Sequence, residues 1–211
     1  MKLFVRSDKK SIDKRAIILD AAHRTFVKRG YSETKVAEIA SEAGVAEGTI
    51  YNYFQSREEL LLALFDEKWG MIIDEIRKKI RRLDDPNKKL KSIFATVVMM
   101  FRKNRQLAEL FMVDIRQSSI FLNNYTINRI VEFLDLIEEI LEEGKKKGIY
   151  RKDLNTRVAR MIIFGAAQGI LLSWVLSESP AVKSKTFKFS LYQAAKTLKD
   201  VFKSGLVGEK K

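Results

Sequence analysis

Apolar residues recur three and four positions apart along almost the whole chain, which is the spacing of helices that each bury one face. Turn-forming residues separate these stretches, and the chain has only two prolines. We therefore predict an all-α protein whose helices cover residues 11–29, 34–43, 46–54, 57–83, 88–102, 105–118, 123–147, 155–177 and 183–203.

The second and third predicted helices have the layout of a helix-turn-helix. Thr34 suits the N-cap of the second helix, because its hydroxyl can accept a hydrogen bond from an unpaired backbone N–H. Gly44 lies at the turn, where a residue tolerant of positive φ is favoured. Ile50 and Phe54 share one face of the third helix and are predicted to be buried. The third helix would then lie in the major groove of DNA.

The opposite face of the third helix is predicted to contact DNA. Thr49 and Asn52 can reach base edges, and Tyr51 can donate its hydroxyl to a phosphate. Glu47 leaves two interpretations open, since its carboxylate can stabilise the helix N-terminus or accept a hydrogen bond from cytosine. The predicted DNA-binding residues are Thr34, Lys35, Ala46, Glu47, Gly48, Thr49, Tyr51, Asn52, Tyr53 and Arg57.

Basic residues precede the first predicted helix, for which Ser11 is the expected N-cap. This basic segment forms either an arm that contacts DNA or an untethered tail, and its basic residues are Lys2, Arg6, Lys9 and Lys10. Both interpretations remain open at this point.

These motifs resemble the DNA-binding domain of TetR-family transcriptional regulators. The chain departs from the family at Ala46, where serine is common, and at Arg57, where lysine is common. The resemblance implies a three-helix DNA-binding domain, predicted over residues 1–56, joined to a larger effector-binding and dimerisation domain over residues 57–211. It also implies a homodimer on a pseudo-palindromic operator in double-stranded DNA. The matching residues are Ile18–Ala22, Phe26, Arg29–Tyr31, Thr34, Ile39–Ala40, Ala43–Val45, Gly48–Phe54 and Arg57–Leu60.

Shorter fragments resemble the fatty-acid-degradation repressors of this family, which respond to long-chain acyl-CoA. The resemblance implies a repressor that a long-chain fatty acyl-CoA releases from DNA, as an effector rather than a cofactor. The alternative is a TetR-type repressor responding to another hydrophobic ligand, such as a drug-like compound or a free fatty acid. The operator, the regulated genes and the acyl chain length remain open. The matching fragments are Ala46–Tyr51, Leu64–Phe65, Glu67–Lys68, Gly70, Ile115–Ser118, Ala159–Arg160, Ile163–Gly165 and Trp174–Val175.

Phenylalanine and methionine are numerous on the apolar faces after residue 57, and such linings adapt to long apolar ligands. Arg116 either pairs with Glu109 or Asp114, or contacts an anionic group of the ligand. Gly70 either allows close packing of a neighbouring helix or makes room for the ligand's tail. The predicted ligand-binding residues are Trp69, Phe94, Val97, Val98, Phe101, Phe111, Met112, Ile115, Arg116, Gln117, Phe133, Phe164 and Gln168.

The last two predicted helices carry the surfaces expected of a dimer interface. Small residues between Gly165 and Gly169 permit close approach of another helix, and an apolar stripe runs from Phe187 to Phe202. Two such helices from each subunit would form a four-helix bundle. Packing within one chain could use the same stripe, although the family resemblance favours the dimer.

The net charge of +13 fits a partner that carries phosphates, but only +3 of it lies in residues 1–58. Most of the remaining charge of +10 is expected on a solvated surface. This positive charge would also attract an anionic effector. The chain has no cysteine, which excludes disulfides and thiolate metal sites. We see no run of the eighteen or so apolar residues that a membrane span needs, and expect a cytoplasmic protein.

Two other functional classes were weighed against a regulator. His23 is the only histidine and is expected on the surface of the DNA-binding domain, and we find no P-loop, dinucleotide-binding glycines or metal-ligand cluster. We therefore predict that the protein is not an enzyme. A non-specific architectural DNA binder would bind random duplex nearly as well as an operator.

Overall fold

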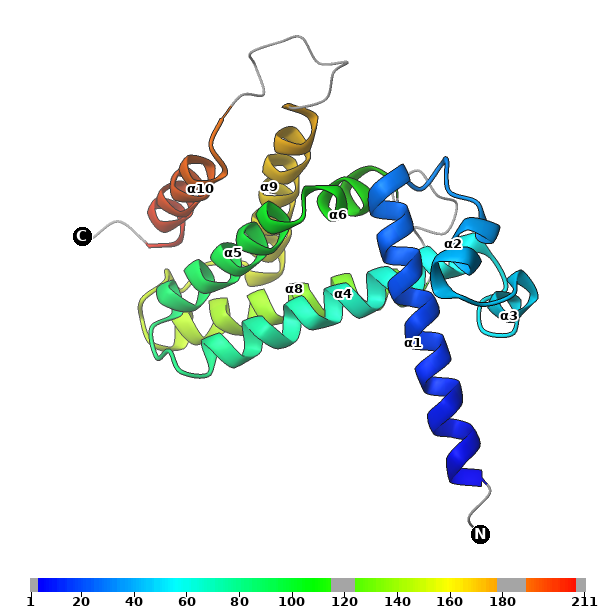
Figure 1. Ribbon diagram of the computed structural model, residues 1–211. Helices are drawn as coiled ribbons and strands as arrows, with labels where there is room; N and C mark the ends of the chain where they lie inside the picture. Colours follow the sequence, from blue (N-terminus) through cyan, green and yellow to red (C-terminus); the bar gives the residue numbers. More distant parts are fainter. Residues whose placement is uncertain (1–3, 115–123, 178–188, 208–211) are drawn as a thin grey trace.

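The computed structural model describes residues 4–114, 124–177 and 189–207. These residues form helices with no strand among them, which confirms the predicted all-α class. Figure 1 shows α1–α3 at one end of the molecule and α10 at the other. In chain order the elements are α1 (Phe4–Arg29), α2 (Val36–Ala43), α3 (Glu47–Tyr51), α4 (Arg57–Ile80), α5 (Pro86–Lys103), α6 (Arg105–Glu109), the π-helix η1 (Leu110–Asp114), α8 (Asn124–Lys146), α9 (Thr156–Ser177) and α10 (Leu191–Leu206).

α1 begins at Phe4 rather than at Ser11, so the prediction of a cap at Ser11 is wrong. Residues 4–10 contain neither glycine nor proline, and nothing in them ends a helix. The backbone at Arg6, Lys9 and Lys10 is therefore helical rather than an extended arm. Lys2 lies outside the described residues. In Figure 1 this first part of α1 extends away from the rest of the molecule.

α4 connects the DNA-binding helices to the remainder of the fold. Its N-terminus is capped by Ser56, whose Oγ accepts a hydrogen bond from the backbone N–H of Glu59 at 3.1 Å. Buried side chains follow along the helix from Leu60 to Ile80, and α4 packs against α1, α5 and α8. It ends at Ile80, somewhat before the predicted residue 83. α4 is therefore in contact with both the first helix of the chain and the interior of the remaining fold.

Gly70 is explained by the packing of α8 against α4. A Cβ at this position would lie 3.1 Å from Nη2 of Arg129 on α8, which leaves little room for a side chain. Arg129 donates through Nε to Asp66 of α4 at 2.6 Å and through Nη1 to Glu132 at 2.8 Å. The interpretation of Gly70 as a site of close helix packing is confirmed.

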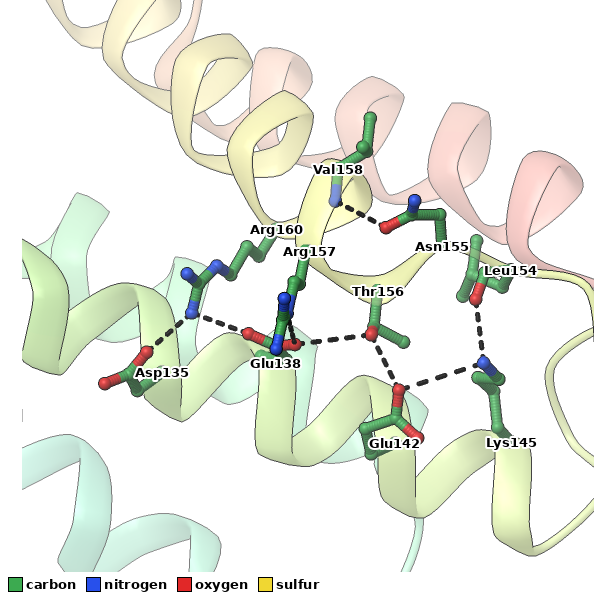
Figure 2. Close-up of polar contacts among 10 residues, drawn as sticks. All are labelled: Asp135, Glu138, Glu142, Lys145, Leu154, Asn155, Thr156, Arg157, Val158 and Arg160. Carbon is green, nitrogen blue, oxygen red and sulfur yellow. Dashed lines mark hydrogen bonds and ion pairs between the residues drawn. The ribbon is translucent and has the colours of Figure 1, made fainter.

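α9 is fixed on α8 by a row of polar contacts (Figure 2). Arg160 lies within 2.5 Å of Asp135 and 2.6 Å of Glu138, both on α8. The hydroxyl of Thr156 donates to Glu142 at 2.6 Å. Lys145 donates to the carbonyl of Leu154, just before α9 begins, at 2.8 Å. These contacts set the position of α9 over the apolar interior.

The helix predicted over residues 105–118 is interrupted. α6 ends at Glu109 and the π-helix η1 follows, while residues 115–123 lie outside the described residues. No glycine or proline in this stretch signals the change of helix type. π-Helices are rare and occur frequently at functional sites. Here η1 supplies Phe111 and Met112 to the interior.

His23 lies at the contact between the DNA-binding helices and the rest of the molecule, so its predicted surface location is wrong. The side chain is half-buried, and Nε2 lies 3.5 Å from Nδ2 of Asn104, which separates α5 from α6. Burial, together with the nearby charge of Lys68, lowers the pKa of His23 below its ordinary value. Periodicity did not reveal this contact, because α1 and α6 are far apart in the sequence.

α9 leaves much of its apolar surface uncovered within one chain. Val158, Met161 and Ile162 are 51%, 53% and 55% exposed. By length and composition α9 could span a membrane, which contradicts the expectation that no segment reaches this threshold. Core helices of soluble proteins pass the same test, and only 22% of the relevant stretch is buried in this chain. The exposed face therefore requires a covering partner or environment.

Candidate functional site

The exposed face of α3 collects the side chains predicted to contact DNA. α3 ends at Tyr51, so the helix predicted over residues 46–54 is shorter than expected. Ile50 of α3 and Phe54 just beyond it are each 1% exposed, which turns the other face of α3 outward. Tyr51 is 50% exposed, and Thr49 is partly exposed. Tyr53 is half-buried and packs against the core. The remaining predicted residues Lys35, Ala46, Glu47, Gly48 and Asn52 are exposed.

The turn before α3 has the predicted backbone geometry. Gly44 has a φ of 66° and follows α2 as its C-cap, with its N–H bonded to the carbonyls of Ala40 and Ser41. The requirement for glycine here follows from this left-handed conformation. The turn leads into α3, which lies close to α2 at one end of the molecule (Figure 1).

Thr34 has a different role from the one predicted. Its side chain is 0% exposed and its hydroxyl donates to the carbonyl of Gly30 at 2.7 Å. Lys35 is the N-cap residue of α2, and its backbone N–H donates to the carboxylate of Glu38 at 3.0 Å. The predictions of Thr34 as an N-cap and as a DNA contact are therefore wrong. Threonine hydroxyls often bond to a nearby carbonyl in this way.

Arg57 is occupied by contacts within the DNA-binding helices. Its Nη1 donates to the carbonyl of Thr34 at 2.7 Å and to that of Ser32 at 3.2 Å. The guanidinium also lies 4.4 Å from the ring centroid of Tyr31, whose hydroxyl donates to Glu58 at 3.0 Å. These bonds give Arg57 a structural role, and its predicted phosphate contact stays a prediction.

We expect Arg57→Ala to lower the free energy of unfolding by about 2 kcal/mol, because it leaves two carbonyls without a charged donor and removes a cation–π contact. Urea denaturation followed by circular dichroism measures this change. Tyr51→Ala is the matched control, because its exposed side chain packs against little and its loss should leave stability nearly unchanged. Equal stability of Arg57→Ala and the wild type would contradict the structural role.

An apolar cavity lies between α4, α5, η1, α8 and α9. Phe65 and Trp69 of α4 stack in it with ring centroids 5.7 Å apart, and Phe111 of η1 meets Phe65 edge-on at 5.0 Å. Gln168 is the polar residue of the lining, which contains no carboxylate among the described residues. The lining consists of Phe65, Trp69, Phe94, Val97, Phe111, Met112, Ile130, Phe133, Ile137, Phe164, Ala167, Gln168 and Leu171.

Eight of the predicted ligand-binding residues line this cavity: Trp69, Phe94, Val97, Phe111, Met112, Phe133, Phe164 and Gln168. Phe101 is buried behind the lining, where its ring packs against those of Trp69 and Phe111. Val98 faces an outer groove instead, because it is one residue away from Val97 on the same helix. Ile115, Arg116 and Gln117 lie outside the described residues.

Five lining residues were missed, and helical spacing could have identified them. Phe65 lies one turn before Trp69 on α4. Ile130 and Ile137 flank Phe133 on α8 at spacings of three and four residues. Ala167 and Leu171 follow Phe164 on α9 at spacings of three and seven residues. Each shares a helix face with a residue that was predicted.

The cavity is small in this conformation. Its volume is about 40 Å³, whereas a cavity that holds one benzene ring has a volume of about 150 Å³. A long apolar ligand can therefore enter only if lining side chains move. The indole N–H of Trp69 is also buried without an acceptor among the described residues, so a ligand with an acceptor oxygen could satisfy it.

The described part of the chain contains no cluster of side chains suited to bind a metal ion. No group of three or more His, Asp or Glu side chains in residues 4–114, 124–177 and 189–207 could hold a metal ion. The chain also contains no cysteine. The features that remain are an outward-facing DNA-binding helix and an apolar cavity.

Sequence profiles of two families match the chain. Residues 18–64 match the profile of bacterial regulatory proteins of the tetR family. Residues 65–202 match the C-terminal region of YsiA-like proteins, a profile within the TetR group. The first match contains the helix-turn-helix, and the second contains every described residue of the cavity lining.

Several relatives with similar sequences and structures are fatty acid regulators. The fatty acid metabolism regulator protein of Bacillus subtilis is 30% identical over 90% of this chain and 93% of its own length. The crystal structure of FadR from Bacillus subtilis in complex with stearoyl-CoA superposes with a TM-score of 0.79 at 29% identity, covering 90% of this chain and 98% of that one.

A second solved structure leads to the same family. The fatty acid degradation regulator FadR from Bacillus halodurans has a TM-score of 0.78 at 34% identity, covering 92% of this chain and 96% of that one. These relatives are transcriptional regulators, and their similarity extends over both the DNA-binding helices and the cavity. The chain therefore belongs to the TetR family of bacterial transcriptional regulators and resembles its FadR-type fatty acid regulators.

Proposed function

We propose that this TetR-type repressor binds a pseudo-palindromic operator as a homodimer and is released by a long-chain fatty acyl-CoA. The observation that carries the proposal is the apolar cavity, because two of its aromatic rings belong to α4, the helix that starts beside α3. The similarity to FadR of Bacillus subtilis, crystallised with stearoyl-CoA, supports this effector class. We place the DNA-binding domain at residues 1–56 and the effector domain at residues 57–211.

Coupling between the two sites follows from the small size of the cavity. An acyl chain has to displace the rings of Phe65, Trp69 or their neighbours before it can enter. The conformation that accepts the effector therefore differs from the one described here along α4. An effector that binds the altered conformation more tightly lowers operator affinity by the same differential free energy.

The lining favours an acyl chain over a drug-like cation. A cation buried in an apolar cavity needs a carboxylate or another acceptor group, since burial of an unpaired charge is costly. Gln168 is the polar residue of the described lining. A free fatty acid or its CoA thioester fits this surface better, and the free acid is the second candidate.

Dimerisation is supported by the uncovered face of α9. At 100° per residue, Val158, Met161, Ile162, Gly165 and Gly169 all fall within one third of the helix circumference. The two glycines leave open space above the helix, which lets a second helix approach closely. A two-fold axis through this face would place α9 and α10 of both subunits in a four-helix bundle.

We expect Ala167→Leu to make the repressor insensitive to effector. The larger side chain would occupy the cavity, so the acyl-CoA concentration needed to release DNA should rise at least about tenfold. Fluorescence anisotropy of labelled operator DNA measures both operator affinity and release. Operator affinity without effector is the internal control and should not change. Release at the wild-type acyl-CoA concentration would contradict the assignment of the cavity.

We place the protein in the cytoplasm, where operator DNA and acyl-CoA are both accessible, and assign it no catalytic activity. The similar relatives are regulators, which supports this assignment. Steady turnover of acyl-CoA by the purified protein would contradict it.

A further inference from the structure

A second hollow lies outside the cavity, in the groove between α5 and α10. One part of this groove has a volume of about 340 Å³ and lies between the middle of α5 and the first half of α10. The other part, of about 240 Å³, continues to the N-terminus of α5 and the end of α10. Lys91, Phe94 and Lys199 line both parts, so the groove is continuous.

Positive charge is concentrated along this groove. The groove lining includes three basic residues of α5, Lys88, Lys91 and Arg102, and two of α10, Lys196 and Lys199. The one carboxylate in the described lining is that of Asp85. Among the described residues, Lys88, Lys91, Arg102 and Lys196 form no ion pair. Lys199 lies 3.4 Å from Asp200, at a solvent-exposed site. Such unpaired cations on two facing helices are suited to a ligand with several negative charges.

Two features of the surrounding helices favour an anion here. The groove reaches the N-terminus of α5, where Asp85 is the N-cap and the helix dipole is positive. Lys196 and Lys199 also lie on a different side of α10 from Val201, an apolar side chain that is 62% exposed. At 100° per residue, Val201 lies about 140° from Lys196 and about 160° from Lys199 around the helix. A dimer whose interface covers Val201 would therefore leave these lysines exposed.

Phe94 connects the groove with the interior. Its side chain lines the inner cavity as well as both parts of the groove. It is only partly buried, and a rotation of its ring would join the two spaces. A ligand that crosses this point would have its apolar tail among the aromatic rings and its polar head among the lysines.

We propose that the groove between α5 and α10 binds the phosphates of the effector's nucleotide head, with Lys91, Lys196 and Lys199 as the principal contacts. The inference rests on the proposed function and deepens it. A free fatty acid carries one carboxylate and does not need this many cations, whereas the CoA head carries several phosphate charges. The groove therefore selects the thioester over the free acid, and Phe94 marks the passage for the acyl chain.

The test compares two variants of the full-length protein that lose the same charge. The groove variant is Lys91→Gln/Lys196→Gln/Lys199→Gln. The control variant is Lys78→Gln/Arg82→Gln/Lys152→Gln, whose residues are exposed, lie outside the groove and form no ion pair among the described residues. Isothermal titration calorimetry measures the Kd for palmitoyl-CoA and for palmitate, and operator affinity without ligand verifies that each variant is folded.

The groove variant is expected to bind palmitoyl-CoA at least about tenfold more weakly than the control variant, with the same affinity for palmitate. Increasing salt should weaken palmitoyl-CoA binding by the wild type more than by the groove variant. If palmitoyl-CoA still releases operator DNA but both variants bind it equally, the groove assignment is overturned while the proposed function stands. If the wild type binds palmitate but not palmitoyl-CoA, both are overturned.

Discussion

Gly144→Ala is expected to lower the free energy of unfolding by about 3 kcal/mol, because no room exists for a methyl group at this position. A Cβ at Gly144 would lie 2.1 Å from Cδ2 and Cε2 of Tyr150. The Tyr150 ring is 2% exposed, and its hydroxyl donates to Asn87 at 3.3 Å. The backbone N–H of Tyr150 also donates to the carbonyl of Gly144 at 3.1 Å. The residue is therefore anchored at its hydroxyl and at its backbone, and its buried ring has little room in which to move.

Urea denaturation at one fixed protein concentration measures this effect, because the stability of a dimer depends on concentration. Gly205→Ala is the matched control, since a Cβ at Gly205 meets no atom within 4 Å and alanine favours the helix. The control should be as stable as the wild type or slightly more stable. A loss of less than about 1 kcal/mol for Gly144→Ala would contradict the packing described for the α8 C-terminus.

Gly48→Glu is expected to weaken operator binding by about a hundredfold without unfolding the protein. A Cβ at Gly48 meets no atom within 4 Å, and the position is exposed, so the fold tolerates the change. On DNA, the new carboxylate lies on the outward face of α3, where phosphates repel it and its bulk prevents close approach. We expect a loss of about tenfold per subunit, and the two subunits of the dimer multiply the effect.

Fluorescence anisotropy with labelled operator DNA measures this loss, and thermal unfolding shows whether the protein remains folded. Gly48→Ala separates the effect of charge from the loss of glycine and should weaken binding much less. The defect of Gly48→Glu should also shrink as salt increases, because salt screens the repulsion. If Gly48→Glu binds the operator as tightly as the wild type, α3 does not contact DNA.

The helices and their turns could be predicted because the sequence encodes them locally. Ile39, Ala40, Ile50 and Phe54 are buried, as the helical spacing indicates, and Gly44 has the positive φ that its place in the turn requires. These features depend on residues within one or two helical turns of each other. Local pattern is sufficient for them.

The contacts of Thr34, Arg57 and His23 could not be predicted from the sequence because they depend on the folded arrangement. Thr34 bonds to Gly30 instead of capping α2, and Arg57 reaches carbonyls more than twenty positions earlier in the chain. His23 meets Asn104, which is 81 residues away. The residue type indicated a hydrogen bond or a charge in each case, but the partner could not be known from spacing.

The cavity was predicted in outline, whereas the basic groove was not. Aromatic residues such as Trp69 and Phe133 identify apolar faces, but spacing alone does not show whether neighbouring side chains fill the space between helices. The lysines of the groove lie on helices separated by about a hundred residues of sequence. In the sequence they are indistinguishable from an ordinary solvated surface, and only the packing of α10 beside α5 brings them together (Figure 1).

The central claim is that occupation of the cavity by an acyl-CoA releases the repressor from DNA. Fluorescence anisotropy of the dimer on its own upstream DNA, with acyl-CoA of twelve to eighteen carbons and with free CoA, tests it directly. The account predicts release by the acyl-CoA and no effect of free CoA, because only the acyl chain forces the rings of α4 apart. Tight operator binding that is indifferent to every acyl-CoA would contradict it.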